Sequence, residues 1–172
     1  LIDEAYYYFH NKSFINFAIN YDHVFITRTF SKFFSMAGAR LGYVVGSREN
    51  IKVVQNLCTP HNTNIFALKF AEFLLTHPNL RNKLLHDFTE GRKFLIEYLN
   101  MNSYSYKGEA GNFLFIKPKS DAFKVVEKMK KNKSILIKAY PQIGCLGDCL
   151  RVTIGDKEVM EKFTSALTEL DH

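Results

Sequence analysis

Two short apolar runs near the start of the sequence place the tightest limit on the fold. Leu1-Ile2 leads into Asp3-Glu4, and residues 24–27 (Val-Phe-Ile-Thr) lead into a polar loop that carries Lys32. Short apolar runs with β-branched residues are typical of buried strands. Asp3 and Lys32 are about thirty residues apart, which is the length of one strand–helix–strand excursion in an open sheet. Because ligands bind beyond the carboxyl ends of such strands, the pattern predicts an α/β sheet with a site near both residues.

The rest of the first hundred residues continues this alternation. A strand is predicted over 41–46, and Ser47 is expected to cap a helix over about 48–57. Apolar residues then recur at intervals of three and four, which predicts two more helices, over about 65–75 and 78–99.

Beyond residue 101 the pattern changes to two strands and a helix, followed by two more strands and a closing helix. The predicted elements are a strand segment at 104–106, a strand at 112–116, a lysine-rich helix at about 120–131, strands at 135–137 and 150–154, and an amphipathic helix at 157–170. This order predicts a small α+β domain over 101–172. Residues 1–100 would be part of a larger α/β domain and would include the long interdomain helix. The N-terminal half of that domain is expected to be missing, because residues 1–6 (LIDEAY) have the pattern of the end of a buried strand that is already under way.

The composition is that of a soluble globular protein. Hydrophobic residues make up 47% of the chain and charged residues 23%, which excludes a disordered chain. The formal net charge is +6, and a lysine cluster over 124–133 is interpreted as a solvated helix face, with no nucleic acid partner. No stretch approaches the roughly 20 apolar residues of a membrane span, so no membrane partner is expected.

The cysteines indicate the compartment and give no sign of a metal site. Cys58, Cys145 and Cys149 are too few for a secreted disulfide framework, which favours the cytoplasm. Cys145 and Cys149 lack a second Cys or His pair at ligand spacing, so no metal is expected. The role of the three thiols is left open.

The segment around Lys32 combines groups that bind anions. Hydroxyl groups stand three and one positions before the lysine, at Thr29 and Ser31, and Arg40 follows eight positions after it. Hydroxyls, backbone amides and a guanidinium around one amine predict a phosphate pocket beside a lysine able to form an imine.

Asp3 and Tyr6 complete a set that suits one cofactor. Pyridoxal phosphate needs a carboxylate for its pyridine nitrogen, a hydroxyl near its phenolic oxygen and a lysine for its imine. Asp3 alone would be interpreted as a strand-end cap. Together with Lys32 and Arg40 it predicts a cofactor site.

With these residues in place, the sequence resembles the fold type I pyridoxal-phosphate aminotransferases, most closely the histidinol-phosphate aminotransferase group. The resemblance rests on three segments in order along nearly the whole chain: Asp3-Glu4-Ala5-Tyr6, residues 29–43 (TFSKFFSMAGARLGY) and residues 150–155 (LRVTIG). It implies part of a large domain with a mainly parallel sheet, followed by the small α+β domain. It also implies a cytoplasmic homodimer of histidine biosynthesis that transfers an amino group between glutamate and a phosphorylated oxo or amino compound.

The same resemblance implies roles for individual residues. Lys32 would bond covalently to pyridoxal phosphate, Asp3 would pair with the pyridine nitrogen, and Tyr6 would contact the phenolic oxygen. The cofactor phosphate would be held by three residues, Thr29, Ser31 and Arg40.

Substrate recognition is assigned to the second half of the chain. Arg151, in the middle of a predicted strand with Asn112 on a neighbouring one, matches the arginine that binds the substrate carboxylate or phosphate. Many members of the group carry a second arginine where this chain has Lys138, and lysine cannot form the same bidentate fork. Lys138 is therefore a possible second cation at the substrate site, and the identity of the substrate that accepts the amino group is left open. Tyr7, Tyr8 and Phe9 are interpreted as core or rim aromatics.

Two alternatives remain beside transamination. The same fold could decarboxylate a phosphorylated amino acid. The chain could also be non-catalytic by itself, because the resemblance places the glycine-rich phosphate loop, the aromatic that stacks on the ring, an asparagine and a partner-subunit tyrosine in an N-terminal half that this chain lacks.

Overall fold

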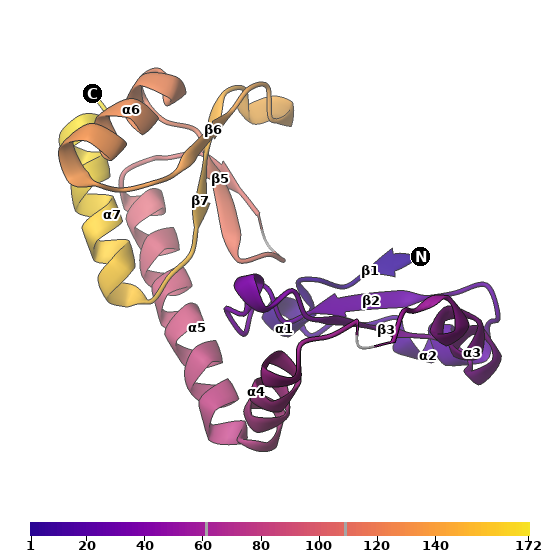
Figure 1. Cartoon of the computed structure of the whole chain (residues 1–172). Helices are drawn as coiled ribbons and strands as arrows, with labels where there is room; N and C mark the ends of the chain where they lie inside the picture. The colour runs from indigo at the N-terminus through magenta and orange to yellow at the C-terminus, as the bar shows by residue number, and fades with distance from the viewer. Residues whose placement is uncertain (61, 109) are drawn as a thin grey trace. The chain divides into compact units, whose positions relative to one another are not determined.

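The computed structural model describes residues 1–60, 62–108 and 110–172. The chain divides into two compact units, Leu1–Leu84 and Leu85–His172, and the division falls inside the long helix α5 (Pro78–Met101). Figure 1 shows the elements of both units. The domain boundary predicted at residue 100 remains a prediction.

The first unit contains a three-stranded sheet whose order is β1-β2-β3. β1 (Ile2–Asp3) runs parallel to β2 (Ile26–Thr29), and β2 runs antiparallel to β3 (Gly42–Val45). A parallel pair needs a crossover connection, which here contains the short helices α1 (Tyr7–His10) and α2 (Ile15–Asn20). The predicted α/β arrangement is therefore confirmed.

Two details of this unit differ from the prediction. β2 begins at Ile26, two residues later than predicted, because the N–H of Val24 donates to the carbonyl of Tyr21 and closes a turn at that point. The helices α1 and α2 were not predicted. They are 4 and 6 residues long, too short to give a clear helical period in the sequence.

The longer helices of the first unit lie where the sequence predicts them. α3 (Arg48–Leu57) begins at Ser47, whose side chain accepts a hydrogen bond from the N–H of Asn50. α4 (Ile65–Thr76) begins at Asn64, which caps two backbone amides in the same way. The 3-10 helix η1 (Ala37–Ala39) lies between β2 and β3. The core of the unit joins the loop around Lys32 to α4 through Phe30, Phe33, Phe34, Met36, Leu41, Ala67, Ala71 and Leu74.

The second unit contains an antiparallel sheet with the order β4-β5-β7-β6. Its strands are β4 (Tyr106–Lys107), β5 (Phe113–Ile116), β6 (Lys138–Tyr140) and β7 (Cys149–Thr153), with the 3-10 helix η2 (Gly144–Leu146) before β7. Together with α6 (Ala122–Lys133) and α7 (Lys157–Leu170), they confirm the predicted order of two strands, helix, two strands, helix.

The strand predicted at residues 135–137 is wrong. Ser134 adopts the left-handed conformation at the end of α6, and the N–H of Ile135 donates to the carbonyl of Met129. These contacts terminate the helix and use the backbone that a strand would need. Leu136 is 79% exposed, and the strand begins at Lys138.

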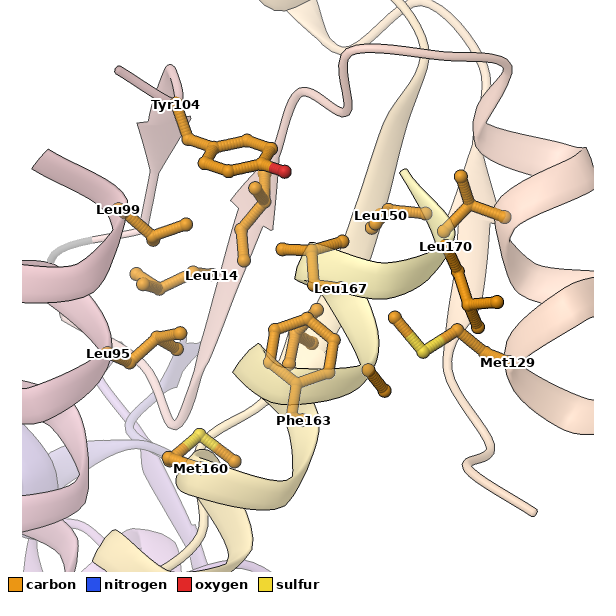
Figure 2. Packing of buried hydrophobic residues seen from close by; sticks show 14 of the residues in the cluster. Leu95, Leu99, Tyr104, Leu114, Met129, Leu150, Met160, Phe163, Leu167 and Leu170 are labelled. Carbon is orange, nitrogen blue, oxygen red and sulfur yellow. The ribbon is translucent and has the colours of Figure 1, made fainter. Parts of the chain in front are cut away.

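The core of the second unit lies between its sheet and its helices. Figure 2 shows Leu95 and Leu99 of α5 beside Leu114 of β5, with Phe163 and Leu167 of α7 packed near them. Gly91 of α5 approaches the turn before α7 so closely that an added Cβ would overlap the carbonyl oxygen of Gly155. On β7, Leu150 and Val152 are buried in this core, so Arg151 lies on the opposite face of the sheet.

Candidate active site

The loop around Lys32 folds back on itself and is anchored by aromatic side chains. The N–H of Phe30 donates to the carbonyl of Leu41 (3.1 Å), and the N–H of Met36 donates to the carbonyl of Phe30 (3.0 Å). Phe33 and Phe34 are buried, whereas Lys32 is exposed. The loop therefore holds an accessible amine on a well-packed support.

Asp3 and Tyr6 lie at the end of the neighbouring strand. Asp3 is opposite Thr27 of β2, and its Oδ1 accepts hydrogen bonds from the N–H of Ala5 (3.0 Å) and the hydroxyl of Thr27 (3.4 Å). The Nζ of Lys32 is 5.9 Å from the centroid of the Tyr6 ring, within cation–π range. The structure thus brings Tyr6 and Lys32 together and places Asp3 on the strand that pairs with β2.

Thr29, Ser31 and Arg40 gather at one end of β2 and β3. The hydroxyl of Thr29 accepts from the N–H of Ser31 (3.0 Å) and donates to the carbonyl of Leu41 (3.3 Å). Arg40 directly precedes Leu41 and adopts the left-handed conformation (φ 51°). Its Nη1 donates to the carbonyl of Ala37 (3.1 Å), and its side chain is exposed. Two hydroxyls and a guanidinium therefore stand close to the lysine loop.

Sequence reasoning missed a buried ion pair beside these residues. Arg28 Nη2 lies 2.9 Å from Glu4 Oε2, and their side chains are only 9% and 5% exposed. The guanidinium carbon of Arg28 also lies 3.6 Å from the centroid of the Tyr7 ring. The alternation of side chains between the two faces of a strand could have indicated this pair. Arg28 lies between Thr27 and Thr29 and must point to the opposite face from both, and Glu4 must point away from the face of Asp3 in the same way.

Hydrogen bonds keep this pair ionised. Burial by itself would raise the pKa of Glu4, but hydrogen bonds from the N–H of Phe14, from Arg28 and from Ser13 outweigh it and lower the pKa. Burial would likewise lower the pKa of Arg28, yet its contacts with Tyr43 and Glu4 raise it. The pair is therefore charged throughout the physiological pH range.

In the second unit, Arg151 and Lys138 face each other on neighbouring strands. Arg151 is opposite Phe115 on one side and Lys138 on the other, and its guanidinium carbon is 4.0 Å from the centroid of the Phe113 ring. Asn112 directly precedes β5, and its carbonyl accepts from the N–H of Ile154 (2.8 Å). Like charges directly opposite each other destabilise a sheet. An anion bound between the two cations would relieve that repulsion.

Neither a metal cluster nor a membrane helix is found in the described part of the chain. Among residues 1–60, 62–108 and 110–172, no group of three or more His, Cys, Asp or Glu side chains could hold a metal ion. The helices formed by these residues all lack the combination of length and hydrophobicity that a membrane span requires. Cys58 and Cys145 are exposed, and Cys149 is buried.

Comparison with known families identifies the chain. Residues 1–167 match the family described as "Aminotransferase class I and II". The chain belongs to the class I and II aminotransferase family. This aminotransferase chain is 30% identical to the histidinol-phosphate aminotransferase of Thermotoga neapolitana over 167 residues. The matched region covers 96% of the chain and 48% of that relative. The predicted family is therefore confirmed, and the chain spans about half the length of the curated relatives it matches.

Solved structures confirm the predicted fold of this aminotransferase chain. The histidinol-phosphate aminotransferase of Clostridium acetobutylicum superposes with a TM-score of 0.84 at 29% identity, covering 98% of the chain and 53% of that structure. The Sinorhizobium meliloti enzyme, solved in complex with pyridoxal-5'-phosphate, gives 0.85 at 20% identity, covering 98% and 47%. An L-threonine-O-3-phosphate decarboxylase from Porphyromonas gingivalis gives 0.75 at 19% identity, covering 97% and 53%, and shares the fold.

Proposed function

We propose that the complete protein carrying this chain is a pyridoxal-phosphate-dependent aminotransferase of the histidinol-phosphate type. It would transfer an amino group between glutamate and a phosphorylated oxo or amino compound, as a cytoplasmic homodimer. The observation that carries the proposal is that Asp3 and the Lys32 loop lie at the ends of two adjacent parallel strands, with Thr29, Ser31 and Arg40 close to that lysine.

The chemistry of these residues fits the cofactor. Asp3 offers a carboxylate for a pyridinium nitrogen, Tyr6 a phenol for the ring oxygen, and Lys32 an exposed amine for a covalent bond. The phosphate would be held by the hydroxyls of Thr29 and Ser31 and by the guanidinium of Arg40. When bound, pyridoxal phosphate supplies an electron sink for the substrate carbanion.

The side chains supply the remaining steps. The Lys32 amine would serve as the acid–base group that takes the proton from the substrate α-carbon and returns it at the new position. Asp3 would pair with the pyridine nitrogen and favour its protonated form. Arg151 binds the donor carboxylate, with Asn112 beside β7 and Lys138 as a second cation suited to phosphate.

The proposed activity requires more than the 172 residues of this chain. The relatives it matches are about twice as long, and we propose that the other half of the enzyme completes the site. The 172-residue chain by itself would then be inactive.

Borohydride reduction of the full-length protein with its cofactor, followed by peptide mapping, tests the proposal. The label should lie on Lys32, and Lys32→Ala should abolish both labelling and turnover, whereas Lys12→Ala, an exposed lysine outside the site, should change neither. A label on any other lysine would overturn the assignment. Product analysis distinguishes transamination from decarboxylation, the alternative reaction on the same fold. Release of carbon dioxide from a phosphorylated amino acid would show that the enzyme is a decarboxylase and not an aminotransferase.

A further inference from the structure

We propose that the Glu4–Arg28 ion pair is a positioning device that fixes the strand end carrying Asp3 and the loop carrying Lys32 in one arrangement. The inference rests on the proposed function, since it requires Asp3 and Lys32 to serve the same ligand. Neither Glu4 nor Arg28 is expected to touch that ligand.

The pair lies on the opposite side of the sheet from Asp3. The N–H of Glu4 donates to the carbonyl of Thr27 (2.9 Å), and Arg28 is opposite Tyr43. Successive side chains in a strand point to opposite faces. Glu4, Arg28 and Tyr43 therefore form one row across the sheet, while Asp3 and Thr27 belong to the other face.

Glu4 ties β2 to the segment that follows α1. Its Oε2 accepts from Arg28 Nε (3.0 Å), Arg28 Nη2 (2.9 Å) and the hydroxyl of Ser13 (2.9 Å), and its Oε1 accepts from the N–H of Phe14 (2.7 Å). Arg28 Nη2 also donates to the hydroxyl of Ser13 (2.8 Å). The segment between Glu4 and Ser13, which contains Tyr6 and α1, is thus fixed at both ends.

Aromatic contacts extend this support to the lysine loop. Tyr7 lies on the Arg28 guanidinium, and Tyr8 of the same helix stacks on Phe33 (ring centroids 5.3 Å apart) and meets Phe34 edge-on (4.9 Å). Phe9 also packs against Phe33 (5.5 Å). Phe33 and Phe34 directly follow Lys32. An unbroken series of contacts therefore runs from the ion pair through α1 to the lysine.

The chemistry of the pair favours positioning over simple stabilisation. Replacing a buried ion pair by apolar residues often leaves a protein equally stable or more stable, so burial alone does not explain why charges are used here. A guanidinium that donates through both Nε and Nη2 fixes direction as well as distance. Backbone hydrogen bonds already hold β1 against β2, but an apolar contact of the same size would not fix the direction in which the segment containing α1 leaves β1.

The test uses full-length protein with its cofactor and the variant Arg28→Lys, which keeps the charge and loses the two-nitrogen contact. We expect kcat to fall roughly ten- to hundredfold with little change in KM, because small misplacements of catalytic groups have effects of this size. The pH midpoint of the visible absorbance of the lysine-bound cofactor should also shift, by about half a unit or more, since Asp3 and Lys32 would face the ring differently. Tyr7→Leu, which leaves no buried charge unpaired, should shift the midpoint in the same way.

Asp171→Asn is the matched control, because it weakens a buried carboxylate network in the second unit without touching the first. It should lower the urea midpoint while leaving the absorbance titration unchanged. If Arg28→Lys and Tyr7→Leu lower stability but keep the pH midpoint and kcat of the parent, the pair is structural only and the inference is overturned. Failure of the proposed function would be recognised separately, by a borohydride label that is absent from Lys32 in the parent protein.

Discussion

At the scale of single residues, neighbouring side chains with the same charge have opposite environments. Asp3 is exposed and faces the candidate site, whereas Glu4 is buried and ion-paired. The pleat of a strand explains the difference, because adjacent side chains point to opposite faces. Asp171 in the second unit is, like Glu4, a buried carboxylate that accepts several hydrogen bonds. Its carboxylate accepts hydrogen bonds from the Tyr104 hydroxyl, from the Ser120 hydroxyl and from the amides of Lys119 and Ser120.

Asp171→Asn should destabilise the second unit by about 2–3 kcal/mol, because an amide cannot replace a charged acceptor of several hydrogen bonds. Burial alone would raise the pKa of Asp171, but the hydrogen bonds from Lys119 and Ser120 lower it. A lowered pKa in the folded state gives stability that is present above the unfolded pKa of about 3.9 and is lost as the pH falls through the folded value. Urea unfolding from pH 7 to pH 2 should show this loss in the parent and less of it in the variant. Asp121→Asn, which keeps a helix-capping residue, should cost only a few tenths of a kcal/mol.

Arg151 and Lys138 carry a prediction about substrate charge in the full-length enzyme. Arg151→Ala should lower kcat/KM by about one to two orders of magnitude for glutamate and for the phosphorylated partner, because a charge-assisted hydrogen bond contributes about 1.5–3 kcal/mol. Lys138→Ala should act mainly on the phosphorylated partner. Steady-state kinetics with both substrates measure the effects, and Lys124→Ala on the exposed face of α6 serves as the control. Unchanged kinetics in Arg151→Ala would show that Arg151 does not bind the substrate and has only a structural role.

At the scale of elements, the caps and close approaches decide where helices begin and how they pack. Ser47, Asn64, Asp121 and Asp156 each accept a backbone N–H at a helix start, so four helices begin where their capping side chains stand. Gly91 sets the distance between α5 and the turn before α7, because backbone atoms of Gly155 and Asp156 occupy the space of a side chain.

Gly91→Ala should therefore destabilise the second unit by about 1–3 kcal/mol, although alanine is the better helix former. Urea unfolding followed by circular dichroism measures the change. Gly38→Ala is the matched control, since no atom lies within 4 Å of an added Cβ there, and it should be neutral or slightly stabilising. Equal stability of the Gly91 variant and the parent would show that α5 can move away from the turn without cost.

At the scale of the whole molecule, the first unit exposes surfaces that globular proteins normally cover. β1 and β3 are the edge strands of its described sheet, and α4 presents Phe66 (81% exposed), Phe70 (51%) and Phe73 (45%) to solvent. Unpaired edges and large apolar patches favour association. Exposed surfaces of this kind are expected here, because the chain spans about half the length of its relatives.

The isolated 172-residue chain is therefore expected to self-associate, to bind pyridoxal phosphate weakly and to lack transaminase activity. Sedimentation velocity over a range of concentrations measures the association, and Phe66→Ser with Phe70→Ser should reduce it. Val53→Ser, at another exposed apolar side chain on α3, should have a smaller effect. A monomeric chain that transaminates glutamate would contradict both this prediction and the proposal that the other half of the enzyme completes the site.

The sequence by itself determined the helices of regular period, most strands, the family and the candidate lysine with its neighbours. These follow from local spacing, because periodicity, capping residues and the segment from Thr29 to Tyr43 are readable along one stretch of chain. Only the tertiary structure decided the order β4-β5-β7-β6, the late start of β6, and the pairing of Glu4 with Arg28. Each of these depends on which distant backbone groups pair and in which register, and a one-residue change of register moves every side chain to the opposite face of a sheet.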